Sequence, residues 1–366
     1  MKKSGKNSIL IGFIVDWVAV GLLVLLFFVL NRYLPDPSVL FSERISVSAV
    51  STPVASQEVT PASTPEADES IAEGTEPEVE PEEAEGSEST PVPEATEDSH
   101  ELTLKEKFAD KFSAETEITS TSYKSPNISV EISTVTEGEG NSLNTIYVAD
   151  IYISDVTCLQ TYINKGHYNS SAGYMGDLLS ESGGVLCING DFAACAGAGY
   201  IVKNGNLMRN DYAVNDVCVI YRDGTLACCS GEGFDAEAAV EDGAWQVFTF
   251  GPSLLDESGA ALSEFAEKYS GISGTNPRTA IGYYEPGHYC FVVVDGRQPG
   301  YSKGFSMARL ASFMEELGCT AAYNLDGGKT SQMMFRRATV NIPYDGGRYV
   351  NDIVLISDIT AGDDNS

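Results

Sequence analysis

The stretch "HYCFVVVDGRQPGYSKGFSMARLASFMEELGCTAAYNLDGG", residues 288–328, carries the clearest structural signals in the chain. Its first apolar run predicts a buried strand that ends at Asp295, and "AAYNLDGG" predicts a second strand that ends at Asp326. Between them, residues 305–319 place Met and Leu side chains on one face and end in a glycine, which predicts a helix. A helix that joins two strands in this way can bring both acidic loops to one edge of a sheet.

Alternating apolar runs on both sides of this unit predict further strands. They are rich in β-branched and aromatic residues, and "KNGN" and "RDGT" supply the Asn-Gly and Asp-Gly pairs of tight hairpin turns. Together with the helix they predict an α+β fold with a mixed β-sheet core and flanking helices. The predicted strands cover 145–154, 184–189, 200–209, 216–229, 278–284, 288–296 and 352–357.

The N-terminus predicts a membrane anchor. Residues 1–7 contain three lysines, and residues 8–30 are apolar over about the length that crosses a bilayer as a helix. The lysines predict a short cytoplasmic tail, and the absence of a small-residue cleavage pattern favours a retained anchor. Asp16 is interpreted as a tolerated polar residue near the membrane interface. The expected location is therefore the cell membrane, in a single pass, with the folded domain on the extracellular face.

The segment 31–100 predicts a disordered acidic linker rich in Pro, Glu, Ser and Thr. Residues 51–100 contain fifteen Asp or Glu and no Lys or Arg, so the segment can bury too little apolar surface to fold. Residues 101–360 are the predicted folded domain, and 361–366 a short tail. The remaining acidic residues still outnumber the 22 Lys and Arg, and no basic face is visible, which argues against a nucleic-acid partner.

The eight cysteines leave two interpretations open. In an exported chain they can form four disulfides, but Cys187, Cys218 and Cys290 lie in apolar runs, where thiols pack as small buried hydrophobes. No cysteine or histidine spacing is typical of a metal site, so no cofactor is assigned and the metal stays unknown, with calcium open. His288 begins a predicted strand and is interpreted as a packed or edge residue.

Five motifs in order, "INGDFAACAGAGYIVKNGNLMRN", "FTFGPSLLDESG", "NPRTAIGYY", "FVVVDGRQPGYSKGFSMARLASFMEELGCTAAYNLDGG" and "GGRYVNDIVLI", resemble the phosphodiester glycosidase family. The resemblance covers about 107–359. That family includes a lysosomal enzyme that removes N-acetylglucosamine from a phosphodiester, and bacterial exported proteins linked to exopolysaccharide. The resemblance implies a membrane-anchored extracellular hydrolase that cleaves sugar-1-phosphodiesters of cell-envelope or exopolysaccharide glycans, with a phosphorylated glycan or sugar-1-phosphodiester as its substrate.

Cleavage at the sugar carbon of such a diester requires carboxylates near the anomeric carbon and donors around the phosphate. Each acidic candidate also has a structural interpretation, because Asp beside Gly is good turn chemistry, and an arginine on a sheet can serve an ion pair. The candidate catalytic residues are Asp191, Asp295, Asp326 and Arg278. The candidate substrate-binding or phosphate-binding residues are Asn189, Arg297, Asn324, Gly327, Gly328, Lys329, Thr330, Ser331 and Arg348.

The loop "NLDGGKTS", residues 324–331, departs from two patterns. It is not a nucleotide-binding loop, because Tyr323 stands where that motif needs a glycine. Relative to the glycosidase family, Lys329 replaces a third glycine and Thr330 a serine. The lysine either directs its ammonium at an anion or narrows the site. The alternative function is therefore a non-catalytic phosphoglycan-binding module of the cell envelope on the same fold.

Overall fold

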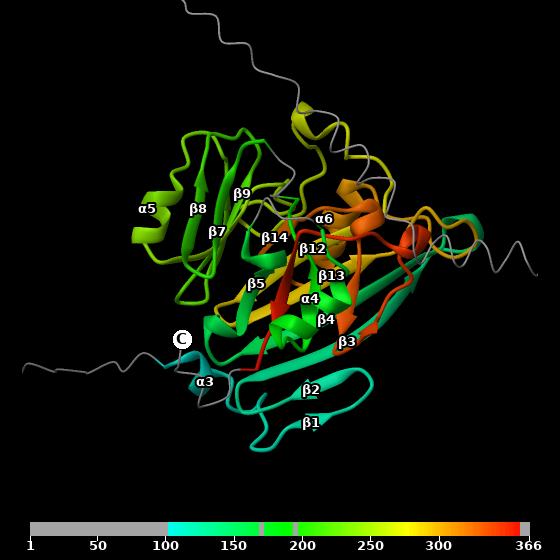
Figure 1. Cartoon of the computed structure of the whole chain (residues 1–366). Helices are drawn as coiled ribbons and strands as arrows, with labels where there is room; N and C mark the ends of the chain where they lie inside the picture. Colours follow the sequence, from blue (N-terminus) through cyan, green and yellow to red (C-terminus); the bar gives the residue numbers. More distant parts are fainter. Residues whose placement is uncertain (1–101, 168–171, 193–196, 359–366) are drawn as a thin grey trace, which may run out of the picture. The chain divides into compact units, whose positions relative to one another are not determined.

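The computed structural model describes residues 102–167, 172–192 and 197–358, which form three β-sheets and a few helices (Figure 1). These residues lie in one compact unit, Pro93–Ser366. The predictions for 1–7, 8–30, 31–100 and 361–366 fall outside the described residues, and so do positions 101, 168–171, 193–196, 359 and 360 of the predicted folded domain. Within the described ranges, no helix combines the length and the apolar character that a membrane span requires.

The largest sheet has seven strands and carries both acidic loops that the sequence predicts. Its centre is the pair formed by β4 and β13, which align from Tyr152 opposite His288 to Ile146 opposite Val294. In sheet order the strands are β1 (Glu117–Ile118), β2 (Ser122–Lys124), β3 (Ile128–Glu137), β4 (Asn144–Ile153), β13 (His288–Val294), β12 (Arg278–Glu285) and β14 (Ala321–Asn324).

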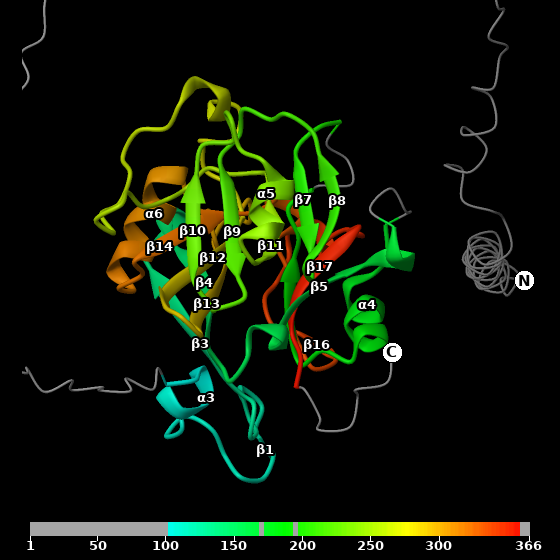
Figure 2. The same ribbon diagram turned by 90° about the vertical axis from the view of Figure 1, so that its left-hand side faces the viewer.

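Two five-stranded sheets pack against the large one, and their strands can be followed in Figures 1 and 2. The first consists of β10 (Leu226–Cys229), β9 (Val217–Tyr221), β11 (Ala244–Phe248), β7 (Tyr200–Lys203) and β8 (Asn206–Asn210). The second consists of β16 (Ala338–Thr339), β15 (Met333–Phe335), β6 (Leu186–Asn189), β17 (Asp352–Ile356) and β5 (Leu159–Ile163).

The helices are short and cover outer faces of the sheets. Ser306 caps the longest of them, accepting a hydrogen bond from the Arg309 amide, and Gly318 with φ +83° follows its end. The α-helices are α3 (Leu104–Lys107), α4 (Met175–Ser182), α5 (Ala236–Glu241) and α6 (Met307–Glu316). The 3₁₀ turns are η1 (Gly140–Ser142), η2 (Val156–Cys158), η3 (Asn164–Gly166), η4 (Glu267–Tyr269), η5 (Gly328–Thr330) and η6 (Tyr344–Gly346).

Strand β13 shows how the layers share one apolar run. Tyr289, Phe291 and Val293 enter the main core between the large sheet and the two smaller ones. Cys290 and Val292 point to the other face, where α6 contributes Leu310 and its neighbours. Because side chains alternate along a strand, a sheet buried on both faces needs a nearly continuous apolar sequence, as this strand has.

The structure confirms the α+β class and the predicted helix, which is shortened to α6. The prediction of a mixed sheet was wrong, because every ladder between the named strands is antiparallel. Strands β13 and β14 still run in one direction, because β12 lies between them and is antiparallel to both. Their C-terminal ends therefore share one edge of the sheet, as the sequence predicts.

The cysteines and His288 take the packed positions that the sequence favours. The seven described cysteines are free thiols, and Cys187, Cys218 and Cys290 are fully buried. The imidazole of His288 stacks on the ring of Tyr152 with centroids 3.9 Å apart and contacts the Asp150 carboxylate at 2.7 Å. These contacts place His288 at the opposite end of β13 from Asp295.

Candidate active site

The candidate site forms where three strand ends meet. Asp326 follows the end of β14, Arg278 begins β12, and Asn189 ends β6 of the smaller sheet. The Asn189 side chain joins the two sheets, because its Nδ2 donates to the main-chain oxygen of Asp326 at 2.7 Å while its Oδ1 accepts from the Thr279 hydroxyl at 2.8 Å. Through these two hydrogen bonds, Asn189 holds the Asp326 loop in its position.

Asp326 is the central carboxylate. Its Oδ2 accepts from the Thr330 hydroxyl at 2.9 Å and from Arg348 Nη2 at 3.0 Å, and its Oδ1 accepts from the Gly327 amide at 2.8 Å. Burial raises the pKa of this carboxyl above its usual range, and these donors oppose the rise. The side chain keeps 15% of its surface exposed, so a substrate can reach it.

Two cavities meet at Asp326. The first, of about 180 Å³, is lined by Asp326, Asp352, Arg348 and the ring residues Phe192 and Tyr349, and we call it the acidic cavity. The second, of about 130 Å³, is lined among others by Asp326, Arg278, Arg297, Asn276 and Gly328, and we call it the arginine cavity. Asp326 is the only carboxylate that lines both of these cavities.

The arginine cavity is built to receive an anion. Arg278 is buried, and its Nε and Nη2 donate only to main-chain oxygens, those of Phe305, Ile272 and Gly274. Arg297 donates through Nε and Nη2 to Asn276 Oδ1. Within the described residues, neither guanidinium has a carboxylate within 4.0 Å. Burial, together with the nearby charge of Arg297, lowers the pKa of Arg278 to about 10, so it stays protonated at neutral pH.

The glycines of the loop serve packing in this structure more than phosphate binding. The Gly327 amide donates to Asp326 and the Gly328 amide to the Pro277 oxygen, so both amides are already used. Gly328 has φ +72°, and a Cβ there would lie 3.3 Å from Arg297 Nη1. The glycines therefore let the loop approach Arg297 closely, and the guanidinium groups that line this cavity are those of Arg278 and Arg297.

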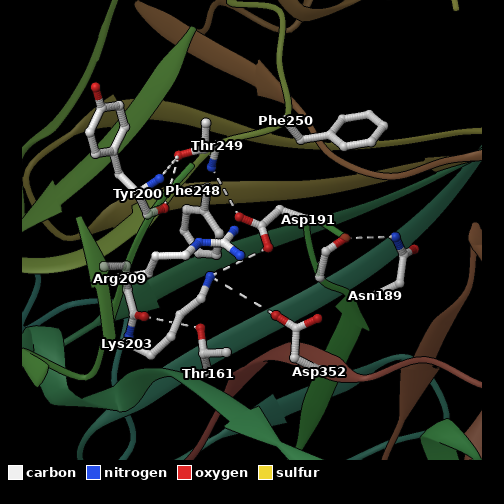
Figure 3. A network of polar contacts seen from close by, with 12 residues as sticks. Thr161, Asn189, Asp191, Tyr200, Lys203, Arg209, Phe248, Thr249, Phe250 and Asp352 are labelled. Carbon is white, nitrogen blue, oxygen red and sulfur yellow. Dashed lines mark hydrogen bonds and ion pairs between the residues drawn. The ribbon is translucent and has the colours of Figure 1, made fainter. Parts of the chain in front are cut away.

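A buried charged cluster lies behind the acidic cavity (Figure 3). Asp191 accepts from the Thr249 amide at 3.0 Å, and its Oδ1 lies 3.6 Å from Lys203 Nζ. Lys203 Nζ also lies 4.0 Å from Asp352 Oδ2 and 3.8 Å from the ring centroid of Phe248. Asp191 is fully buried and lines neither cavity. Asp191 therefore lies behind the residues that line the acidic cavity and has no surface in either cavity.

The sequence analysis did not single out Lys203 or Asp352. Both carried a signal, because a lysine within the apolar strand "YIVK" and an aspartate at the start of "DIVLI" are charges where a strand expects burial. Such charges are paired or functional, since an isolated buried charge is costly.

The remaining predicted residues take different places. Asp295 is buried and accepts from Asn341 Nδ2, the Ile342 amide and the Tyr301 hydroxyl, so it ties loops together outside both cavities. Asn324 lines the arginine cavity and donates to the Gly251 oxygen. Ser331 is buried and lines neither cavity. Lys329 also lines neither and pairs with Asp345 of η6.

A larger cavity, about 850 Å³, lies elsewhere, between the β1–β2 hairpin and the β15–β16 turn. Its lining contains Arg336 and Arg337 but no carboxylate, so it lacks the group that glycoside cleavage requires. In the described part of the chain, no three His, Cys, Asp or Glu side chains are grouped to hold a metal ion.

Comparisons with known proteins agree with this geometry. Residues 182–357 match the family model described as phosphodiester glycosidase, which confirms the resemblance seen in the motifs. The fold is similar to the catalytic domain of zebrafish N-acetylglucosamine-1-phosphodiester alpha-N-acetylglucosaminidase, auto-inhibited by pro-peptide, with a TM-score of 0.54 and 18% identity over 67% of this chain and 88% of that one.

A relative in sequence is the SPbeta prophage-derived uncharacterized protein YomE of Bacillus subtilis (strain 168). It is 30% identical over 164 residues, which are 43% of this chain and 25% of that protein. The chain thus matches a quarter of that relative's length.

Proposed function

We propose that residues 101–360 hydrolyse the glycosidic bond of sugar-1-phosphodiesters, with the sugar in the acidic cavity and the phosphate in the arginine cavity. We further propose that the protein acts from a membrane anchor on the extracellular face, on cell-envelope or exopolysaccharide glycans. The observation that carries the proposal is the position of Asp326, whose side chain lines both cavities. A bond between a sugar and a phosphate would span this junction.

The charges on the two sides suit the charges that the reaction develops. As the glycosidic bond breaks, the sugar becomes oxocarbenium-like and the phosphate leaves as an anion. The carboxylate of Asp326 would face the developing positive charge. Arg278 and Arg297 would hold the departing phosphate, because guanidinium groups bind phosphate oxygens with charge-assisted hydrogen bonds. Phe192 and Tyr349 at the acidic cavity offer apolar ring surfaces to the sugar.

The position of Lys329 supports the hydrolase over the binding module. Its ammonium pairs with Asp345, and the side chain lines neither cavity. The family's third glycine is therefore replaced on the outer side of the loop, where the lysine does not narrow the space beside Asp326.

The test is hydrolysis by the purified full chain of a panel of sugar-1-phosphate methyl diesters, in both anomeric forms, in ¹⁸O-labelled water. Cleavage of the glycosidic bond releases free sugar carrying the label and an unlabelled methyl phosphate. Cleavage of the phosphorus–oxygen bond instead leaves a sugar-1-phosphate or labels the phosphate, and would assign a phosphodiesterase. Binding of the diesters without any release of sugar would favour the non-catalytic module.

A further inference from the structure

The charged side chains of Lys203, Asp191 and Asp352 lie together, with Arg209 close by (Figure 3). The side chains of Lys203, Asp191 and Asp352 keep 2%, 0% and 8% of their surface exposed. Lys203 Nζ and Asp352 Oδ2 are buried atoms that make no hydrogen bond. Of the three residues, only Asp352 lines the acidic cavity, which also contains Asp326.

The two carboxylates of the cluster, Asp191 and Asp352, are held differently. Asp191 is the better held carboxylate, since Lys203 lies 3.6 Å away and the Thr249 amide donates to it at 3.0 Å. Asp352 lies farther from Lys203, at 4.0 Å. Its buried Oδ2 makes no hydrogen bond, so Asp352 is the carboxylate that is more costly to ionise and that takes up a proton more readily. Asp352 also lines the acidic cavity, so a proton can pass between this side chain and the cavity.

The surroundings of Asp352 set its pKa near neutrality. Burial raises the pKa of this carboxyl to about 7; the charge of Lys203 from β7 lowers it, and those of Asp191 after β6 and Asp326 after β14 raise it. Arg348, on the segment before β17, pairs with Asp326, and Arg209 of β8 also lies near the cluster. A carboxylate of this kind is a good proton acceptor at neutral pH, since a catalytic pKa works best near the operating pH.

We propose that Asp352 is the general base of the reaction, and that Lys203 and Asp191 are positioning residues that hold it ready; this rests on the proposed function. Asp352 takes a proton from the attacking water as the water oxygen bonds to the anomeric carbon. The bond between that carbon and the phosphate oxygen breaks, and its electron pair leaves on the phosphate. The proton then passes from Asp352 to solvent through the cavity.

The first arm of the experiment measures kcat/KM against pH for the full chain on the best diester of the panel. The wild type is expected to gain activity as pH rises through about 7. Asp352→Asn should lose 10²–10⁴-fold, the usual contribution of a general base, and lose this pH limb. Asp191→Asn should move the limb to lower pH, and Lys203→Met to higher pH, because the two charges act on Asp352 with opposite sign.

A matched control separates this role from loss of an ion pair. Asp216 pairs with Lys268 at 3.1 Å and lines neither cavity, so Asp216→Asn should keep both the rate and the pH limb. A second arm uses Asp352→Ala with sodium azide, since an anionic nucleophile needs no base. Azide should restore turnover and yield a glycosyl azide, which a purely structural role would not produce.

The outcomes separate the two proposals. If the wild type releases no sugar from any diester, the proposed function fails and the role of Asp352 with it. If the wild type is active, but Asp352→Asn keeps its rate and pH limb or azide gives no glycosyl azide with Asp352→Ala, only the assignment of the base is overturned.

Discussion

The two cavities that share Asp326 are opposite in charge and in the way their charges are held. The acidic cavity has carboxylates backed by a buried ammonium, whereas the arginine cavity has guanidinium groups held by main-chain oxygens and one amide side chain. Within the described residues no carboxylate neutralises those arginines. The contrast suggests that one side serves a group that becomes positive and the other a group that leaves negative.

Asp326 is the residue whose loss should affect both sides most. Asp326→Asn keeps the size of the side chain and can still accept from the Thr330 hydroxyl, but it removes the negative charge beside the reacting carbon. We expect kcat to fall by about 10³-fold or more, or about 4 kcal/mol of transition-state stabilisation. Steady-state release of sugar measures this. Asp345→Asn, on an exposed neighbouring loop, is the control, and equal losses in both variants would contradict the central role of Asp326.

The free energy of unfolding should depend on the ionisation of Asp352 in the acidic cavity, and this dependence can be measured without substrate. The folded-state pKa of Asp352, about 7, lies above the roughly 3.9 of an unfolded Asp. Between these values the native state binds more protons than the unfolded state, so this group makes stability fall as pH rises from about 4 to 7. Asp352→Asn should remove a loss on the order of 2–4 kcal/mol.

The measurement is the free energy of unfolding in urea at pH 4, 5.5, 7 and 8 for the wild type and Asp352→Asn. The difference between the two proteins matters, since other groups titrate equally in both. A constant difference in the free energy of unfolding across this range would mean that Asp352 is ionised throughout. The acidic cavity would then hold no proton on Asp352.

Arg297 of the arginine cavity should contribute less to kcat/KM than Asp326 does, and mainly through binding of the substrate. Arg297→Ala removes an exposed guanidinium from the cavity without opening the core, so we expect kcat/KM for diesters to fall roughly 10- to 100-fold, or about 1.4–2.8 kcal/mol. An uncharged aryl glycoside of the same sugar should lose little. Arg337→Ala, at an exposed position beside the 850 Å³ cavity, is the matched control. Equal losses of kcat/KM on charged and uncharged substrates would show that Arg297 does not bind the phosphate.

The elements around the site differ in how well the sequence predicted them. Helix α6 and strands β13 and β14 were predictable because their apolar periods are long and their ends carry glycine or a polar cap. Strand β3 was missed although "ISVEISTVTE" alternates, because Ser, Thr and Glu weaken its apolar signal. The strand is stabilised by its pairing with β4 over ten residues, a tertiary contact that local β-propensity does not show.

The site was predictable in its chemistry more than in its geometry. The motifs pointed to Asp326, Arg278 and Arg297, which do line the cavities. No local pattern shows that Asp191 lies behind Asp352, because their contact with Lys203 depends on how β6, β7 and β17 pack. Asp295 shows the reverse, since its turn chemistry resembles that of Asp326, but its oxygens are occupied by Asn341 and Ile342.

The smallest effect should come from Lys329, the residue that departs most visibly from the family pattern. Its ammonium pairs with Asp345, and the two side chains keep 39% and 66% of their surface exposed. Exposed pairs of this kind contribute about 0.2–1 kcal/mol, because water screens the charges and two long side chains must be ordered. Lys329→Gly should therefore lower the free energy of unfolding by less than about 1 kcal/mol and change kcat/KM less than threefold. A fall of tenfold or more in diester binding would mean that the lysine turns inward when substrate is present. A rise in sugar release would mean that it blocks the site. The first result would shift phosphate contacts from the two arginines to the loop, and a kinetic comparison with Arg297→Ala on the same diester would measure how the contacts divide.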